Sequence, residues 1–203
     1  MVGIVTLALA GGCTNATGGE ATPGPTGSVT APPSEEPSDP PSSAVPTTDI
    51  PPRPRDLSLD GVKPCSLFTS AQLAQLQSQL KIDKPPRVHT TGDHYKAPAC
   101  LLEQSREPFH SFDAMLVTSE GIEPWLSGNR NVDAWLVSVG GYPAVDYKLK
   151  GTDDAECATS VDVADGQQLI VDLIPLERAD YHQLCRMTEQ VATMAVQTLQ
   201  TLR

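Results

Sequence analysis

The 203-residue chain has too few basic side chains for a protein that binds nucleic acid. It contains 14 Lys and Arg against 25 Asp and Glu, which gives a formal net charge of −11 at pH 7. Nucleic acids and anionic lipid headgroups are both bound through basic patches. The composition therefore argues against either of them as a partner of the folded region.

The chain also lacks an apolar run of the length that crosses a membrane. A transmembrane helix needs about 20 predominantly apolar residues. The run from Val2 to Ala10 is shorter, and no second apolar span follows it. Its length is instead typical of the apolar part of a signal peptide.

Motifs that mark catalytic or metal sites are missing as well. The sequence has no Gly-x-Ser-x-Gly nucleophile motif, glycine-rich phosphate loop, EF-hand spacing or zinc ribbon. We therefore assign no catalytic residue, metal or cofactor. The histidines and one acidic cluster are expected in solvated loops, turns or caps: His89, His94, His110, His182, Asp153, Asp154 and Glu156.

Cys13 separates the apolar run from a tract rich in Pro, Thr, Ser and Gly, and Ala10-Gly11-Gly12 directly precedes it. This order resembles the cleavage site of a bacterial lipoprotein precursor, in which the cysteine receives a diacylglyceryl group and becomes the mature N-terminus. Two fatty acyl chains, such as palmitate, anchor a protein stably, whereas one binds only marginally. The pattern predicts a signal peptide over 1–12 and a lipid anchor on Cys13, at the extracytoplasmic face of the cell membrane.

Two features depart from the usual lipoprotein pattern. No Lys or Arg precedes the apolar run, and Ala10 stands where Leu is preferred. Translation from an upstream start would supply the missing charge, and we expect such a start. The alternative is a buried N-terminal strand with an incidental cysteine, which would have little to pair with.

Composition divides the rest of the chain at about Leu57. Residues 14–56 hold 11 of the 19 prolines and no aromatic residue, so they cannot bury enough apolar surface to offset chain entropy. We expect a disordered linker over 13–56, whose Thr and Pro are also compatible with O-linked sugars. Residues 57–203 have the length and composition of one globular domain.

Four cysteines in this domain, Cys65, Cys100, Cys157 and Cys185, predict disulfide bonds. An even number behind an export signal is typical of a disulfide framework, although four cysteines allow three pairings. We favour pairing in sequence order, which would tie each terminal helix to a strand. No spacing indicates a redox or zinc site.

Local patterns predict an α+β fold, with an antiparallel sheet packed against an N-terminal helix and a long C-terminal helix. Thr69 and Gln72 form a capping box ahead of a helix over 70–80. Asp180 begins a second helix of about 22 residues with one apolar stripe. Strands are expected over 100–104, 111–118, 134–139, 144–150, 158–163 and 168–174, with turns at Gly140-Gly141 and Asp165-Gly166. The polar stretch 87–99 is expected to be a loop.

Several of these segments also resemble a known family. The segments are Pro64-Cys65-Ser66-Leu67 before the first helix, Ala99-Cys100-Leu101, Gly141-Tyr142-Pro143-Ala144, Cys157 ahead of Val161-Asp162-Val163, and Cys185 in a helix rich in Val and Ala. Over 57–203 they are similar to actinobacterial lipoproteins of the domain of unknown function 3558 family, although Leu102 stands where that family often has an aromatic residue. The resemblance implies export, lipid anchoring and two disulfides, but no activity. The architecture is also similar to sensor domains of mycobacterial receptor kinases, which implies ligand sensing.

Together these patterns predict a non-enzymatic, lipid-anchored envelope protein that binds or senses a small molecule or a protein. Trp125 and Trp135 are the candidate pocket residues. A binding protein predicts an apolar cleft near one of them, and an interaction module predicts a flat apolar patch. The alternatives are an accessory subunit of a membrane complex and an enzyme acting on wall glycan or peptide. The enzyme would have converging carboxylates or a histidine in a polar pocket.

Overall fold

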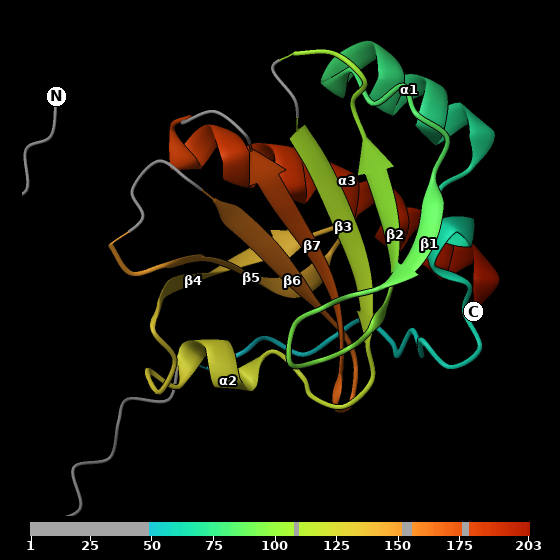
Figure 1. Cartoon of the computed structure of the whole chain (residues 1–203). Helices are drawn as coiled ribbons and strands as arrows, with labels where there is room; N and C mark the ends of the chain where they lie inside the picture. Colours follow the sequence, from blue (N-terminus) through green and yellow to red (C-terminus); the bar gives the residue numbers. More distant parts are fainter. Residues whose placement is uncertain (1–48, 108–109, 152–155, 176–178) are drawn as a thin grey trace, which may run out of the picture. The chain divides into compact units, whose positions relative to one another are not determined.

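The computed structural model describes residues 49–107, 110–151, 156–175 and 179–203 (Figure 1). The predicted signal peptide, Cys13, most of the predicted linker, Asp153 and Asp154 lie outside these residues. None of the helices in the described ranges is both long and apolar enough to cross a bilayer.

One seven-stranded antiparallel sheet forms the centre of the domain, in the order β1-β2-β3-β7-β6-β5-β4. Its strands are β1 (Arg87–Thr90), β2 (Pro98–Glu103), β3 (His110–Val117), β4 (Val132–Val139), β5 (Tyr142–Leu149), β6 (Cys157–Ala164) and β7 (Gln167–Pro175). Six of them match the predicted strands. The α+β class is therefore confirmed.

The helices begin where the capping residues predict. In α1 (Ser70–Leu80), the Thr69 side chain accepts a hydrogen bond from the Gln72 backbone amide, and the Gln72 side chain accepts one from the Thr69 backbone amide. Asp180 caps α3 (Tyr181–Leu202) in the same way, through the Gln183 amide. A 3₁₀ turn, η1 (Pro64–Leu67), and the one-turn helix α2 (Glu123–Leu126) complete the set.

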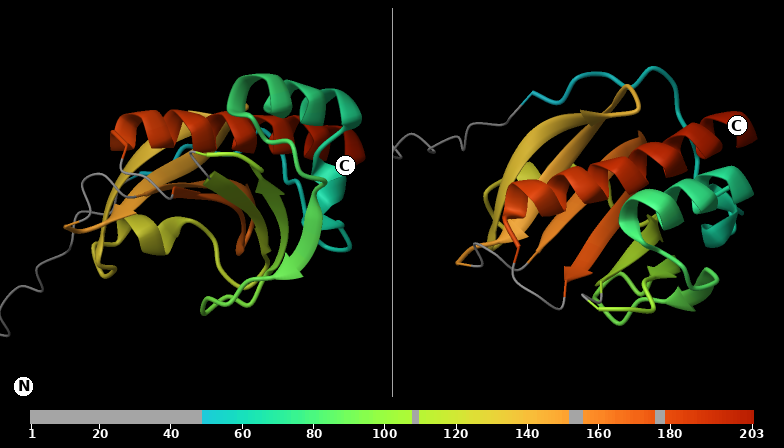
Figure 2. Two further views of the ribbon diagram at one scale, coloured as in Figure 1. Left: turned by 45° about the horizontal axis from the view of Figure 1, so that its top comes forward. Right: turned by 90° about the horizontal axis from the view of Figure 1, so that it is seen from above.

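Both α1 and α3 cover the same face of the sheet, and the sheet curves away from them (Figure 2). The main hydrophobic core lies between these layers. It is formed by side chains that alternate along the strands and meet the apolar stripe of α3, such as Phe112, Val171, Val191 and Leu199. The opposite side of the sheet is therefore concave and free of long helices.

A second, smaller apolar cluster lies on this concave face. It includes Ala99, Met115, Ile170, Ala158 and Val145 from the strands. Trp125 of α2 and Ile122 before it cover part of the cluster, at the end of the sheet where β4 and β5 lie (Figure 2). The remainder of the concave face is the largest sheet surface without a packed helix within the described residues.

The two disulfides are confirmed with the predicted pairing. Cys157 on β6 is bonded to Cys185 on α3, and Cys65 to Cys100 on β2. Cys65 lies in η1, just before the helix that it was expected to hold. Each bridge therefore ties a segment on the helix side to the sheet beneath it.

The packed chain starts earlier than the predicted boundary at Leu57. Arg53 donates two hydrogen bonds, of 2.7 and 2.8 Å, to the carboxylate of Asp162 on β6, and it also pairs with Asp165 in the β6–β7 turn. The Leu57 amide donates to the Val163 carbonyl at 2.7 Å. Composition alone assigned residues 49–56 to the linker because they contain three prolines, but these ion pairs hold the segment on the domain.

Candidate functional site

A row of side chains crosses the middle of the concave face. The strand registers place Asp113 of β3 opposite Asp172 of β7, Asp172 opposite Ala158 of β6, and Ala158 opposite Tyr147 of β5. Directly opposed residues in antiparallel strands have Cβ atoms about 4.5–5.5 Å apart. Two carboxyl groups are thus neighbours, and in the row only the small Ala158 side chain lies between them and Tyr147.

His89 extends this row from β1. Its Nε2 lies 2.7 Å from Oδ1 of Asp113, and both side chains keep some solvent contact, 35% and 13% of the side-chain surface respectively. A carboxylate in this position fixes the orientation of an imidazole. The pair forms although β1 lies in the stretch that was predicted to be a loop.

The pKa of Asp172 lies near physiological pH. Desolvation by the surrounding strands raises its pKa to about 7, and the negative charges of Glu156, Asp113 and Asp93 add to this effect. The residue is nevertheless only partly buried. A carboxyl group that is crowded by protein but still reached by water can donate or accept a proton.

A second polar cluster lies beside α2. The guanidinium of Arg130 donates to Oε1 of Glu120 at 2.5 Å and to the Tyr95 hydroxyl at 2.8 Å. It also lies 3.9 Å from the ring centroid of Trp125, and the Trp125 ring stacks on that of Tyr147 with the centroids 3.8 Å apart. Burial raises the pKa of Tyr95 to about 12, so that this hydroxyl stays protonated. These contacts hold the aromatic side of the concave face in place.

The arrangement offers three kinds of chemistry on one surface. Asp113 and Asp172 provide carboxyl groups for a cation or for sugar hydroxyls, and His89 provides an imidazole held by a carboxylate. Tyr147 and Trp125 provide aromatic surface. Such a combination of apolar and polar groups in a concavity is typical of small-molecule sites.

The two tryptophans that the sequence singled out lie on opposite faces of the sheet. Trp125 belongs to the concave cluster, is 7% exposed, and donates through Nε1 to Oε1 of Gln168 at 2.8 Å. Trp135 is half-buried against the main core, where its ring meets that of Tyr181 edge-on at 5.8 Å. They therefore do not line a common pocket, and only Trp125 adjoins the row of carboxyl groups.

The other histidines and Glu156 are dispersed. His94 and His182 are exposed and lie beside the rings of Tyr95 and Tyr181. His110 Nε2 lies 2.9 Å from the Leu80 carbonyl at the end of α1. Glu156 accepts a hydrogen bond from the Leu149 amide. Among the histidines, His89 alone contacts a carboxylate of the concave row, and Glu156 acts on that row through its effect on the pKa of Asp172.

One group of three metal-type ligand atoms lies close together among the described residues, namely Asp146, Cys157 and Cys185. The two sulfurs are bonded to each other, so neither is free as a thiolate ligand. Burial raises the pKa of Asp146 to about 8, and nearby Glu189 adds to the shift. Its Oδ1 accepts from Thr159 at 2.6 Å. The neutral acid thus serves a buried hydrogen-bond network under α3.

No local sequence signal predicts the pairing of Asp113 with Asp172. Each lies at an alternate, concave-facing position of its own strand, as polar residues do on any half-exposed sheet face. Only knowledge of the β3–β7 pairing would have brought the two together. A carboxyl residue inside a run as apolar as Leu169–Leu173 is the one hint that the chain contains.

Comparison with known proteins gives one result. Residues 8–198 match the family model described as "Protein of unknown function (DUF3558)". The match spans both the predicted linker and the domain, and it confirms the family resemblance. Neither a curated protein nor a solved structure matches the chain.

Proposed function

Since the chain belongs to the DUF3558 family of proteins of unknown function, we propose that it is an exported, lipid-anchored protein of the cell envelope that binds a small molecule on its concave face. Disulfides persist in oxidising compartments outside the cytoplasm, and the domain has two of them. Cys13 is the residue that would carry the lipid. This combination supports export and anchoring.

The observation that carries the binding role is the position of Asp172. A carboxyl group with a pKa of about 7 lies between a second carboxyl group and a tyrosine, on a face that α1 and α3 do not cover. Perturbed ionisable groups in a concavity are typical of functional sites. Neither Asp113 nor Tyr147 neutralises the charge of Asp172, so an ionised Asp172 favours a ligand that brings a hydrogen-bond donor or a positive charge.

Anchoring is tested by replacing Cys13 with Ala in cells that are fed a labelled fatty acid. The variant is expected to lose the label and to leave the membrane fraction, whereas Thr14→Ala keeps both. A Cys13→Ala protein that still sediments with membranes would contradict lipid anchoring.

The binding face is tested by a thermal-shift screen of small molecules with the wild type and Asp172→Asn. We expect compounds that raise the melting temperature of the wild type at pH 8 to have a smaller effect on the variant. Asp60→Asn, which changes an exposed carboxyl group elsewhere, is the matched control. Compounds that stabilise all three proteins equally would place the ligand away from the concave face.

A second candidate function, an enzyme acting on wall glycan or peptide, is favoured by the contact of His89 with Asp113. An imidazole oriented by one carboxylate, beside a carboxyl group that is half protonated near neutral pH, has the parts of an acid–base pair. Incubation with purified cell wall, followed by mass spectrometry of released fragments, tests this function. Fragments that appear with the wild type but not with His89→Ala would favour the enzyme over the binding protein.

A further inference from the structure

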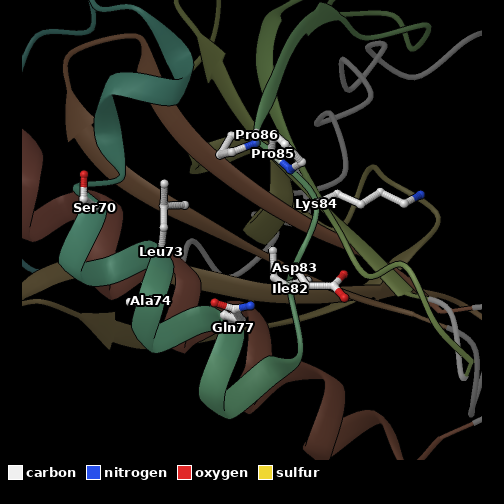
Figure 3. A pocket seen from close by; sticks show the side chains of 9 residues that line it. All are labelled: Ser70, Leu73, Ala74, Gln77, Ile82, Asp83, Lys84, Pro85 and Pro86. Carbon is white, nitrogen blue, oxygen red and sulfur yellow. The ribbon is translucent and has the colours of Figure 1, made fainter.

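A groove that is separate from the concave face runs along α1. Its first part is mainly apolar, has a volume of about 350 Å³, and lies between α1 and the segment that leads to β1 (Figure 3). Leu73 and Ala74 come from the helix, and Ile82, Pro85 and Pro86 from the facing segment.

The second part of the groove is polar and lies at the C-terminal end of α1. It has a volume of about 320 Å³ and is lined by Gln77, Lys81, Asp83, Gln104, Arg106 and Glu107. Gln77 and Asp83 line both parts, so the two adjoin. The groove thus joins an apolar channel to a charged end.

Gln104 is the unusual residue of the polar end. It is 7% exposed, and its Oε1 is buried without a hydrogen-bond partner. No hydrogen bond of its amide nitrogen is found either within the described parts of the chain. A buried amide in this state destabilises the folded protein, and it is therefore a group that a ligand would satisfy.

The polar end carries two cations, Lys81 and Arg106, and two carboxylates, Asp83 and Glu107, and an anionic group would have to approach on the side of the cations. Asp83 is already engaged, since its carboxylate accepts from the Ser105 amide at 2.7 Å and from the Ser105 hydroxyl at 2.6 Å. These bonds hold the pKa of Asp83 below its usual range. Lys81 donates only to the Ser78 carbonyl, and Arg106 is exposed with no bonded partner among the described residues. Two cations at the rim thus remain available.

We propose that this groove binds the C-terminal end of a short apolar peptide. A carboxamide offers one acceptor and one donor group, so its partner must bring a donor and an acceptor side by side. The penultimate residue of an extended peptide does this, because its own N–H and C=O point to the same side. The terminal carboxylate then lies within reach of Lys81 and Arg106, and the preceding apolar side chains follow α1 past Leu73. Because Oε1 is shielded from water, the Gln104 side chain rotates toward the cleft as the peptide enters.

A phospholipid headgroup is less suitable than a peptide, although it also carries a negative charge. Its phosphate provides acceptors only and leaves Oε1 of Gln104 unpaired. The phosphodiester of the headgroup and the terminal carboxylate of a peptide each carry one negative charge, so the N–H donor that the peptide adds, and not the charge, distinguishes the two ligands. This difference separates the two ligands experimentally.

The test uses the full chain with Cys13→Ala and a library of N-acetylated tetrapeptides of apolar residues. The library is supplied as free acids and, separately, as C-terminal amides, and binding is followed by NMR of the side-chain amides. We expect free acids to bind and the corresponding amides to bind about tenfold more weakly, a difference that one lost ion pair accounts for. Failure of every free acid, or equal binding of the amides, would overturn the proposal.

Four variants locate the site. Arg106→Gln should weaken peptide binding several-fold, whereas Arg186→Gln, an exposed arginine on α3, and Asp172→Asn on the concave face should leave it unchanged. Gln104→Met should weaken binding about tenfold while the melting temperature stays equal or rises, because an unpaired buried amide is replaced by an apolar side chain of similar length. A lower melting temperature would show that Gln104 is structural and would contradict the proposal.

Binding to vesicles of phosphatidylglycerol tests whether a lipid headgroup, and not a peptide, occupies the groove. If the Cys13→Ala chain sediments with them, Arg106→Gln does not, and no free-acid peptide competes, the groove binds a lipid headgroup and the peptide proposal is wrong. Because these measurements depend neither on lipidation nor on Asp172, their failure leaves the proposed function of the protein unaffected.

Discussion

Asp113 and Asp172 lie directly opposite each other on β3 and β7, on the face of the sheet that α1 and α3 leave uncovered. Like charges at directly opposed positions destabilise a sheet. The protein reduces this cost by keeping one of the two protons up to neutral pH, since the pKa of Asp172 is raised to about 7. The charge of the concave face therefore changes near neutral pH.

Stability should fall with rising pH because of this carboxyl group. Between its ordinary pKa of 3.8 and about 7, Asp172 is ionised in the unfolded chain but protonated in the folded protein. The contribution of Asp172 to the free energy of unfolding is therefore fully present below pH 3.8 and decreases progressively between pH 3.8 and about 7. Above pH 7 it stays at its lower value. Each pH unit between these two pKa values lowers the free energy of unfolding by at most about 1.4 kcal/mol. We expect Asp172→Asn to be more stable relative to the wild type at pH 8 than at pH 4, by roughly 1–3 kcal/mol, in urea unfolding.

The exposed carboxyl variant Asp60→Asn controls for a general effect of charge. It should follow the wild-type profile at both pH values. An Asp172→Asn protein whose advantage is the same at pH 4 and pH 8 would show that the raised pKa of Asp172 does not govern stability.

Arg53 should be necessary for full stability although it precedes the predicted domain. Its side chain is 17% exposed and that of its partner Asp162 is 6% exposed. Arg53→Met leaves the carboxylate of Asp162 without its counter-charge, which in a partly buried position costs about 2 kcal/mol. Arg55→Met, which loses only bonds to backbone carbonyls at the end of α3, should cost less than about 1 kcal/mol in the same urea titration. Equal effects would argue against the ion pair.

Local signals sufficed for much of the fold. The helix α1 begins and ends at the predicted residues because its capping box and apolar spacing lie within twelve positions. The β6–β7 turn follows from Asp165-Gly166, where Gly166 has φ 66° and only glycine adopts that conformation readily. In both cases the neighbouring residues determine the conformation.

Two elements that the sequence did not indicate depend on distant partners. The strand β1 is four residues long, mostly exposed, and becomes a strand only because it pairs with β2. The helix α2 is a single turn with Pro124 in it, held by the packing of Trp125 on the concave cluster. For the same reason the candidate site could not be predicted, since His89, Asp113 and Asp172 meet only through strand pairing.

Both disulfides should contribute to stability by similar amounts. Their cysteines are 35 and 28 residues apart, and closing loops of that size stabilises a folded protein by roughly 3.5–4 kcal/mol each in the chain-entropy model. We expect the double replacement Cys157→Ala with Cys185→Ala, and likewise that of Cys65 with Cys100, to lower the free energy of unfolding by amounts of this order. Non-reducing peptide mapping of the wild type should yield two linked peptide pairs, and a free thiol at any of the four positions would contradict both bridges.

The placement of the two tryptophans on opposite faces allows each face to be observed separately. Trp135→Phe leaves Trp125, stacked on Tyr147 in the row that contains Asp172. Trp125→Phe leaves Trp135 against the core under α3. Ionisation of Asp172 adds a negative charge near Tyr147, so we expect the emission of the Trp135→Phe protein to change with a midpoint near pH 7. The Trp125→Phe protein should not show this transition, and adding Asp172→Asn should remove it from the Trp135→Phe protein. Equal transitions in the two single-tryptophan proteins would assign the titration to another group and would remove the main support for the concave face as the binding site.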